Sequence, residues 1–128
     1  MKYFIDSIVI PVPKAKRAAY LRLARVASKV WIEHGALEYH ECIADDVPRG
    51  KRTSFPRSVQ LKSSETVWIS WIVYRSRRHR DRVNAEVMKD ARFAQMNPKT
   101  LPFDAKRMFY GGFVEVVSRR RVKQRAKH

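Results

Sequence analysis

The sequence has one cysteine and only twelve acidic residues among its 128 positions, and it has no long apolar run. Because Cys42 has no second cysteine to pair with, an internal disulfide is excluded, as is usual in a reducing cytoplasm. No apolar stretch approaches the roughly 20 residues that cross a bilayer. Asp6 also interrupts the apolar start of the chain, where a signal peptide would continue. We therefore expect a cytoplasmic protein without a membrane partner.

Basic residues, in contrast, are abundant. The 28 Lys and Arg residues exceed the 12 Asp and Glu residues by 16 charges, and the isoelectric point is about 10.7. Hydrophobic residues make up 45% of the chain, which is enough for a core, and a chain of 128 residues forms one domain rather than two. This balance excludes a disordered chain and an acidic DNA mimic, and it permits a polyanionic partner.

Six basic residues follow one another near the end of the sequence without an acid between them: Arg119, Arg120, Arg121, Lys123, Arg125 and Lys127. Val122 is the one sizeable apolar residue there, so the segment cannot bury enough surface to order itself. We therefore predict a folded domain over residues 1–117 and a flexible basic tail over residues 118–128. The tail is either a solvated terminus or an arm that binds nucleic acid or another polyanion weakly and without sequence preference.

A second basic cluster spans residues 75–82, at the predicted start of a helix. Ser76 is placed to cap that helix, and Arg77 and Arg78 would stand in its first turn, against the positive end of the helix dipole. Two explanations remain open. Carboxylates elsewhere in the fold, such as that of Asp81, can pair with the arginines. Alternatively, an anion binds at Ser76, Arg77 and Arg78 through free N–H and guanidinium groups.

Hydrophobic periodicity predicts four strands and two long helices. Their order is strand, helix, strand, strand, helix, strand, over residues 3–10, 14–34, 36–44, 66–74, 76–89 and 107–117. Pro11 and Pro13 are expected to end the first strand, and Gly35 to end the first helix in a left-handed conformation. The pair Gly111-Gly112 predicts a bulge or the close approach of another group. The apolar face of the first helix is expected to contain Ala19, Leu23, Val26, Ala27, Val30 and Trp31.

This order is that of a split βαβ, or ferredoxin-like, α+β fold, in which two helices cover one face of a four-stranded antiparallel sheet. A sheet covered on one face should alternate apolar and polar residues. The third predicted strand instead carries Val67, Ile69 and Trp71 on one face. Its other face carries Trp68 and Ile72. We therefore predict that a second copy of the chain covers the remaining face, so that two sheets pack face to face in a homodimer.

Several blocks of the chain resemble the bacterial YbaA-like family of unknown function, over roughly residues 1–117. The blocks are Trp31–Tyr39, Cys42–Pro48, Thr53–Pro56, Ser70–Tyr74, His79–Ala85, Pro102–Asp104, Lys106–Met108 and Tyr110–Phe113. The resemblance implies the dimeric α+β barrel superfamily, which includes small cofactor-free oxygenases and ligand-binding stress proteins. Ala105 departs from the pattern, because a glycine is expected there, and the basic tail is an addition. The family itself brings no established activity.

Glu38, His40 and Cys42 are of the residue types that bind metal ions, and they project from the same face of one predicted strand. Successive side chains on one face of a strand stand about 7 Å apart, so these three cannot easily close a tetrahedron around one ion. We predict neither a metal nor a cofactor.

Candidate pocket residues are polar or aromatic groups near the ends and inner faces of the predicted elements. His34, at a helix end, is the candidate general base, with Glu38 and Tyr39 assisting it, although a hydrogen bond to a terminal carbonyl would equally explain His34. The candidate ligand-binding residues are Trp71, His79, Asn84 and Tyr110. Asn84 lies among apolar helix positions, where an unpaired amide costs roughly 1–3 kcal/mol, so we expect it to have a partner. Aromatic residues in such positions also form ordinary cores.

These observations favour a protein that binds or transforms a small organic molecule in a pocket between sheet and helices. If the protein is an enzyme, a cofactor-free, oxygenase-like activity is the expectation. Two alternatives remain: a basic accessory protein that binds nucleic-acid phosphates through residues 75–82 and the tail, and a non-catalytic structural or interaction dimer. The salt dependence of binding distinguishes the first alternative from small-molecule binding in a pocket, because polyanion binding weakens steeply as the salt concentration rises.

Overall fold

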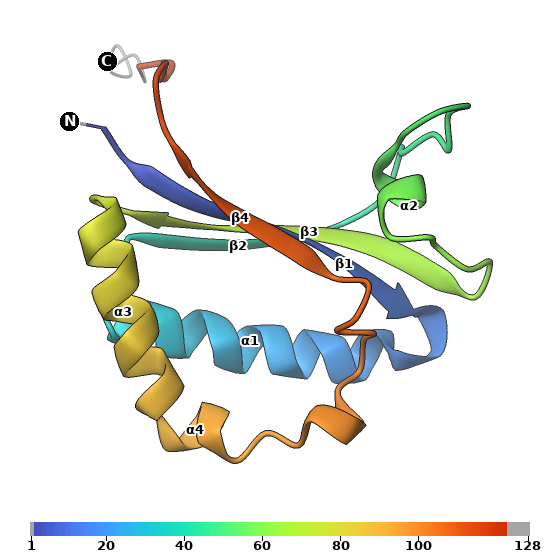
Figure 1. The fold of residues 1–128 in the computed structure, drawn as a ribbon, viewed down its shortest axis with the longest axis horizontal. Helices are drawn as coiled ribbons and strands as arrows, with labels where there is room; N and C mark the ends of the chain where they lie inside the picture. Colours follow the sequence, from blue (N-terminus) through green and yellow to red (C-terminus); the bar gives the residue numbers. More distant parts are fainter. Residues whose placement is uncertain (1, 123–128) are drawn as a thin grey trace, which may run out of the picture.

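The computed structural model describes residues 2–122 and contains one four-stranded sheet with two long helices (Figure 1). The strands are β1 (Phe4–Pro13), β2 (Glu38–Ile43), β3 (Glu65–Tyr74) and β4 (Phe109–Val114). The helices are α1 (Arg17–Glu33), α2 (Phe55–Ser58), α3 (Arg77–Lys89) and α4 (Ala91–Ala94), with short 3₁₀ helices at Lys14–Lys16 and Pro98–Thr100. The predicted order of strands and long helices is confirmed.

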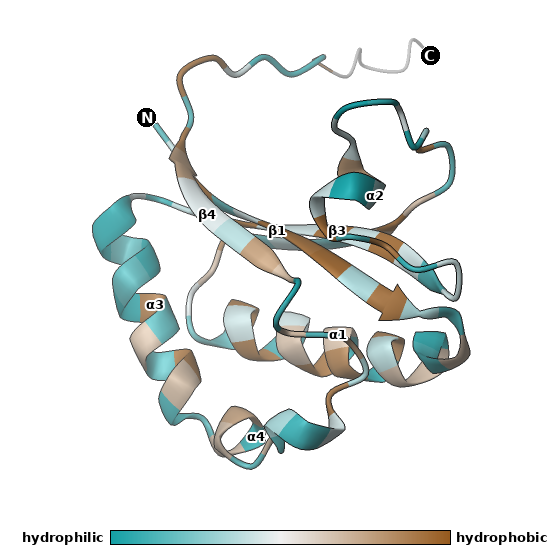
Figure 2. Ribbon diagram, turned by 45° about the vertical axis from the view of Figure 1, so that its right-hand side comes forward, coloured by the Kyte–Doolittle hydropathy of each residue, from teal (hydrophilic) through white to brown (hydrophobic). Residues whose placement is uncertain are grey.

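The sheet is antiparallel throughout, in the order β2-β3-β1-β4. The two strands richest in hydrophobic residues, β1 and β3, lie at its centre (Figure 2). The helices α1 and α3 cover one face of the sheet, while α2 lies against the opposite face (Figure 1). This is the predicted ferredoxin-like α+β fold. Even-numbered residues of β1, β3 and β4 and odd-numbered residues of β2 share the helix-covered face, because the register aligns Ile8 with Ser70 and Ser70 with Glu41.

The first strand is longer than the sequence predicts, because it continues through both prolines to Pro13. The register explains why they are tolerated there. Strand β4 pairs only with residues 4–9 of β1, so beyond Val9 one side of β1 is an edge. A proline at an edge leaves no hydrogen bond of the ladder unmade, although it lacks an N–H group.

The buried face of helix α1 matches the predicted one in part, since Ala27 and Val30 are buried as predicted. Its buried residues are Tyr20, Ala24, Ala27 and Val30. Val26 was predicted to face the core but is 40% exposed, because the spacing of four residues from Tyr20 to Ala24 sets the inner face. Gly35 follows the helix with a φ of 114°, so the predicted left-handed conformation is confirmed.

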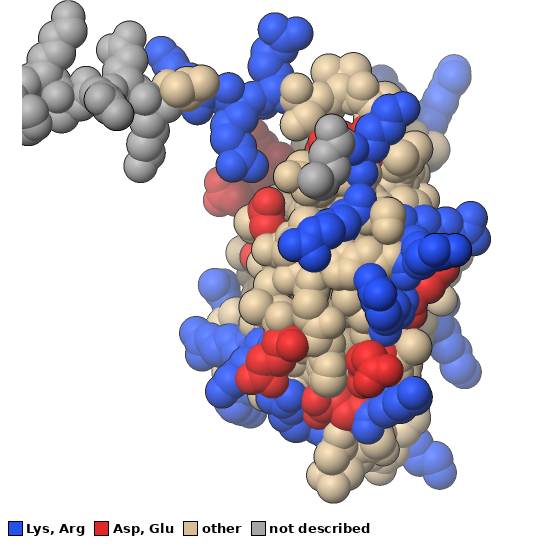
Figure 3. Space-filling model, turned by 90° about the vertical axis from the view of Figure 1, so that its left-hand side faces the viewer, with Lys and Arg blue, Asp and Glu red and all other residues tan. Residues whose placement is uncertain are grey.

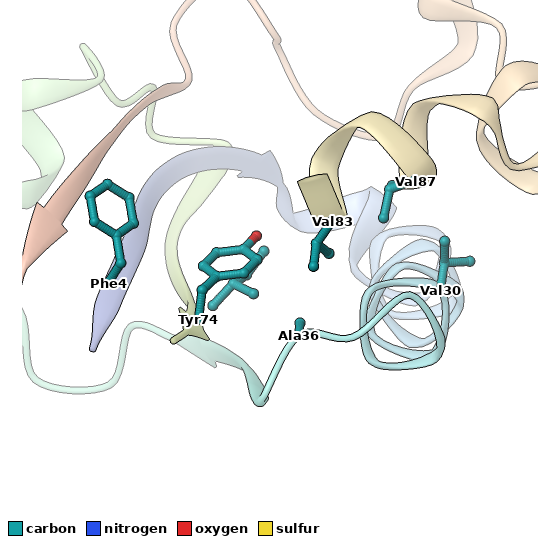
Figure 4. Close-up of a cluster of buried hydrophobic side chains, with 7 residues drawn as sticks. Phe4, Val30, Ala36, Tyr74, Val83 and Val87 are labelled. Atoms are coloured by element: carbon teal, nitrogen blue, oxygen red, sulfur yellow. The ribbon is translucent and has the colours of Figure 1, made fainter. Parts of the chain in front are cut away.

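The first core cluster joins α1 and α3 to one end of the sheet. It contains Phe4, Val30, Ala36, Ile72, Tyr74, Val83 and Val87. In Figure 4, Val83 and Val87 extend from α3 into the space between Tyr74 and the Val30 side chain of α1. A second cluster, at the other end of the sheet, contains Ile10, Val12, Tyr20, Ala24 and Trp68. A cavity lies between the helices and the sheet, and residues of both clusters line it.

The glycine pair in β4 reflects a close approach, as one of the two predicted explanations had it. A Cβ atom at Gly112 would lie 2.5 Å from Cζ of Phe4, whose ring is buried. A Cβ atom at Gly111 would lie 3.6 Å from the nearest side chain, which is an ordinary contact. Of the two glycines, Gly112 is therefore the one that the Phe4 ring requires.

We expect Gly112→Ala to lower the free energy of unfolding by about 1–3 kcal/mol, because a buried ring must move to admit the methyl group. Gly111→Ala is the matched control in the same strand and should change it by less than about 0.5 kcal/mol. Urea unfolding of both variants measures the difference. Equal stabilities would show that Phe4 can move aside without cost.

The face of the sheet away from α1 and α3 carries a group of apolar side chains, which we call the open face: Ile5, Val9, Ile69, Trp71, Phe109 and Phe113. The segment around α2 covers one end of this side, where Val67 is buried. The rest is partly or largely exposed, and Phe113 reaches 60%. The prediction that β3 is apolar on both faces is confirmed. The connection between β2 and β3, which contains α2, thus covers part of this face of the sheet.

Residues 118–122 are exposed and form no helix or strand, whereas Lys123, Arg125 and Lys127 of the predicted tail lie outside the described residues. None of the helices within residues 2–122 combines the length and the apolar character that crossing a membrane requires.

Candidate functional site

A cavity of about 460 Å³ lies between the helix-covered face of the sheet and α1, α3 and the segment that runs from α4 to β4. On the α1 side, Ala24 and Ala27 line the cavity between larger residues of the same helix, and their small side chains leave space there. Most of the remaining wall is apolar or aromatic, with contributions from Ile8, Ile10, Leu23, Trp31, Ile72, Met88, Phe93, Met96, Pro98, Leu101, Phe103 and Met108. Polar side chains reach it at a few points: Asp6, Tyr20, Tyr39, Ser70, Asn84 and Tyr110.

Asn84 is held in place by two hydrogen bonds. Its Oδ1 accepts from Nε1 of Trp31 at 3.0 Å and from the hydroxyl of Tyr74 at 3.1 Å. The first bond joins α1 to α3, and the second joins α3 to β3. The prediction that Asn84 has a partner is confirmed, and the side chain is fixed in one orientation at the cavity wall.

Glu41 lies beside the cavity and receives two tyrosine hydroxyls. Tyr20 of α1 donates to Oε1 at 2.5 Å, and Tyr39 of β2 donates to Oε2 at 3.0 Å. Burial raises the pKa of Glu41, while the two hydrogen bonds partly oppose that effect. Burial and the nearby Glu41 charge raise the pKa of both tyrosines, so each remains a protonated donor. The Glu41 carboxylate and the two tyrosine hydroxyls thus form one hydrogen-bonded group at the junction of α1 and β2.

A second carboxylate, that of Asp6 in β1, reaches the cavity at the level of α3. Its Oδ1 accepts a 2.6 Å hydrogen bond from Nη1 of Arg80, whose Nε donates to Asp81. The Arg80 guanidinium also lies over the Phe4 ring, 4.8 Å from its centroid. Of the two explanations for the basic residues at the start of α3, pairing with carboxylates therefore applies to Arg80.

The segment between α4 and β4 forms the outer wall of the cavity and is anchored by Arg107. Its Nη1 and Nη2 atoms donate to the two oxygens of Glu65 at 2.8 and 2.5 Å, and its Nε donates to Asp104 at 2.8 Å. Nη1 also donates to the carbonyls of Val59 and Gln60. One side chain thus ties the outer wall to the start of β3.

The structure brings three of the predicted pocket residues to the cavity: Tyr39, Asn84 and Tyr110. Glu38 and Trp71 do not reach it. They lie on the other side of the sheet, where the ring of His40 stacks on Trp71 with centroids 4.5 Å apart. Nε2 of His40 lies 2.8 Å from Oε1 of Glu38, which accepts the hydrogen bond. Expecting them in one pocket with Tyr39 was wrong, because Glu38 precedes Tyr39 in the strand and Trp71 pairs with His40, so both point to the opposite face.

The two predicted histidines also lie outside the cavity wall. His34 follows α1, and its Nε2 lies 2.9 Å from Oδ2 of Asp90. His79 is buried in the first turn of α3, where its Nδ1 accepts from the backbone N–H of Arg75 and burial lowers its pKa. Both contacts join an element to its neighbour, so a structural role accounts for each ring.

The predicted cap of α3 is confirmed, because the Ser76 hydroxyl accepts from the backbone N–H of His79. This bond occupies one of the N–H groups that an anion would use. Arg77 and Arg78 are exposed. On the side of the molecule shown in Figure 3, acidic groups lie among the basic ones on the lower part of the surface. Anion binding at Ser76, Arg77 and Arg78 stays a prediction.

Within residues 2–122, no three His, Cys, Asp or Glu side chains converge as metal ligands would. The polar cavity groups that the sequence analysis missed are Asp6, Tyr20, Glu41 and Ser70. For Glu41 and Tyr39 a signal existed, since residues two apart on a strand share a face. For Tyr20 and Asp6, which meet partners far away in the sequence, none did.

Comparison with known proteins gives a family without an assigned activity. A protein family of unknown function, DUF1428, matches residues 3–105. The uncharacterized protein YbaA of Escherichia coli K12 is 43% identical over 117 residues, which is 91% of this chain and 98% of YbaA. The YbaA of Shigella flexneri is equally similar.

Solved structures share the fold at low sequence identity. A dimeric ferredoxin-like protein from an uncultured marine organism has a TM-score of 0.56 and 12% identity, and the match covers 91% of this chain and 97% of that one. A candidate antibiotic biosynthesis monooxygenase from Bacillus cereus has a TM-score of 0.51 and 10% identity, covering 95% and 99%. At these identities the similarity shows the fold alone.

Proposed function

The chain belongs to the DUF1428, YbaA-like family, and we propose that it binds a small, largely apolar organic molecule in the cavity between its sheet and helices. The observation that carries the proposal is the cavity itself. Its volume of about 460 Å³ falls in the range of small-molecule sites, roughly 300–1,000 Å³. Such sites combine apolar walls with a few fixed polar groups. Here the fixed polar groups are Asn84 and the Tyr20–Glu41–Tyr39 group.

The volume of the cavity distinguishes it from the small packing defects of a protein core. A protein interior tolerates few spaces larger than a water molecule, because each one forfeits contacts. The Ala24 and Ala27 side chains leave this space open where leucines would close it.

We also propose that a second copy of the chain covers the open face. Six apolar side chains in one patch exceed what a monomer commonly leaves in water. A second copy offers the same flat, apolar sheet, so a two-fold axis through the patch buries both faces at once. The marine protein with the same fold is described as dimeric. In this arrangement the cavities lie on the outer side of each sheet.

The uncharged fluorophore N-phenyl-1-naphthylamine tests ligand binding, because its emission rises in apolar surroundings. We expect saturable binding to the native protein. Ala27→Phe, which places a ring in the cavity, should weaken binding at least about tenfold. Ala85→Phe, at an exposed position of α3, is the matched control and should bind as the native protein does. Equal binding by all three proteins would place the fluorophore elsewhere and contradict the proposal.

A polyanion partner is the second candidate, favoured by the net charge of +16 and by exposed Arg77 and Arg78. Phosphate contacts of this kind weaken with salt, by a factor set by the number of ions released. Binding to a labelled RNA at 50 mM salt that disappears near 200 mM, together with unchanged fluorophore binding, would assign the two activities to separate surfaces.

A further inference from the structure

The cavity differs from the rest of this molecule in charge. The protein carries a net charge of +16, yet among the described residues that line the cavity there is no Lys and no Arg. The ionisable acid in its wall is Asp6, and the carboxylate of Glu41 stands directly behind Tyr20 and Tyr39. Arg80, the base that contacts Asp6, is already paired with two carboxylates. An anionic ligand would find no counter-ion here and would face two negative groups.

Asn84 presents hydrogen-bond donors to the cavity. Because the Trp31 indole nitrogen can only donate, the atom it contacts must be the carbonyl oxygen Oδ1, which fixes the orientation of the amide. The two N–H groups of Nδ2 then point away from Trp31. No hydrogen bond between described residues uses them, and no side-chain polar atom of those residues is both sealed from solvent and unpaired. Nδ2 therefore remains accessible and unpaired among the described residues, on a side chain that lines the cavity.

The opposite polar group of the cavity accepts rather than donates. The hydroxyl hydrogens of Tyr20 and Tyr39 are directed to Glu41, so only their oxygen lone pairs remain for a ligand. Trp31 stands between this group and Asn84, since it packs 6.0 Å from the Tyr39 ring and donates to Asn84. The cavity thus has a donor at α3 and acceptors at the junction of α1 and β2, separated by an aromatic wall.

We infer that the cavity selects an uncharged carbonyl compound, with its carbonyl oxygen on Nδ2 of Asn84 and its apolar body against Trp31, and that it rejects the corresponding carboxylate. A hydroxyl or amine at the far end of the ligand would donate to Tyr20 or Tyr39. This inference rests on the proposed function and names the chemical class of its ligand.

Three fluorescent probes of similar size test the inference: the neutral naphthyl ketone Prodan, the corresponding dimethylaminonaphthoate, and propyl-dimethylaminonaphthalene, in which a methylene replaces the carbonyl. We expect the native protein to bind the ketone about tenfold more tightly than the carbonyl-free probe. We expect the naphthoate to bind at least about tenfold more weakly than the ketone. The ranking of the three probe affinities is measured on the native protein, so this test does not depend on a variant that folds.

Asn84→Asp then assigns the preference to the amide. Aspartate keeps an oxygen for Trp31 and Tyr74 but replaces the donor by an oxygen, so the ketone should bind no better than the carbonyl-free probe. A thermal melt within a few degrees of the native protein shows that the variant is folded. Retention of the ketone preference in the variant, or equal binding of naphthoate and ketone to the native protein, would overturn the inference while leaving the cavity as a binding site. Failure of all three probes would overturn both.

Discussion

Replacement of Val9 by glutamate should convert the protein from a dimer into a monomer. Val9 lies at the centre of the open face, paired with Ile69 on one side and Phe109 on the other. In the proposed dimer the new carboxylate would be buried against the second sheet, and the two-fold axis would bring in a second one. Burial of an unpaired charge is strongly unfavourable, so we expect the dissociation constant to rise by at least about a thousandfold, or about 4 kcal/mol.

Sedimentation equilibrium at micromolar concentration measures this change. Val26→Glu is the matched control, because it makes the same substitution at an exposed position of α1. It should leave the protein dimeric. The fluorophore should still bind to the Val9→Glu monomer, since the cavity lies on the other face of the sheet. A native protein that sediments as a monomer would contradict the proposed dimer.

Replacement of Arg107 by methionine should give the largest loss of stability of any substitution considered. The side chain is 15% exposed and its partner Glu65 only 5%, and the methionine would leave the Glu65 carboxylate buried without its counter-ion. Breaking such a pair costs about 3 kcal/mol or more, which corresponds to a fall in Tm of about 10 °C for a domain of this size. The outer wall of the cavity would also lose its anchor, so we expect weaker fluorophore binding.

Acid titration tests the cause of that loss. The hydrogen bonds from Arg107 lower the pKa of Glu65, so the pair contributes stability above the ordinary glutamate pKa and loses it as pH falls through the lowered value. The difference between the native protein and Arg107→Met should therefore shrink as pH falls below about 4. Lys106→Met, at the exposed neighbouring residue, is the control and should unfold as the native protein does at every pH. A loss that is independent of pH would contradict this role of the ion pair.

The fold could be predicted from the sequence because it depends on local periodicity. Alternation in β3 and the helical spacing in α1 and α3 define their buried faces within the element itself. Pro11 and Pro13 were misleading because their effect depends on where β4 ends, which is a property of the assembled sheet. The burial of Tyr20 instead of Val26 likewise depends on packing against Trp68, 4.9 Å away between ring centroids.

The site could be predicted only in part. Asn84 was identified because an amide among apolar helix positions requires a partner, and that argument needs no tertiary information. The alternation of β2 correctly separates Tyr39 and Glu41 from Glu38 and His40, but it does not show which of the two sets faces the helices. The partners of Glu41 and Asp6 come from elements far apart in sequence, and Tyr20 and Arg80 reach them only once the sheet and helices are packed.

Methyl NMR of ¹³C-methionine-labelled protein would locate the bound ligand, because Met88, Met96 and Met108 all line the cavity. On titration with the neutral naphthyl ketone, we expect the methyl signals of these three residues to shift together and saturate, and Ala27→Phe to abolish the shifts. Unmoved signals at saturating ketone, or shifts that persist in Ala27→Phe, would show that the cavity does not hold the ligand.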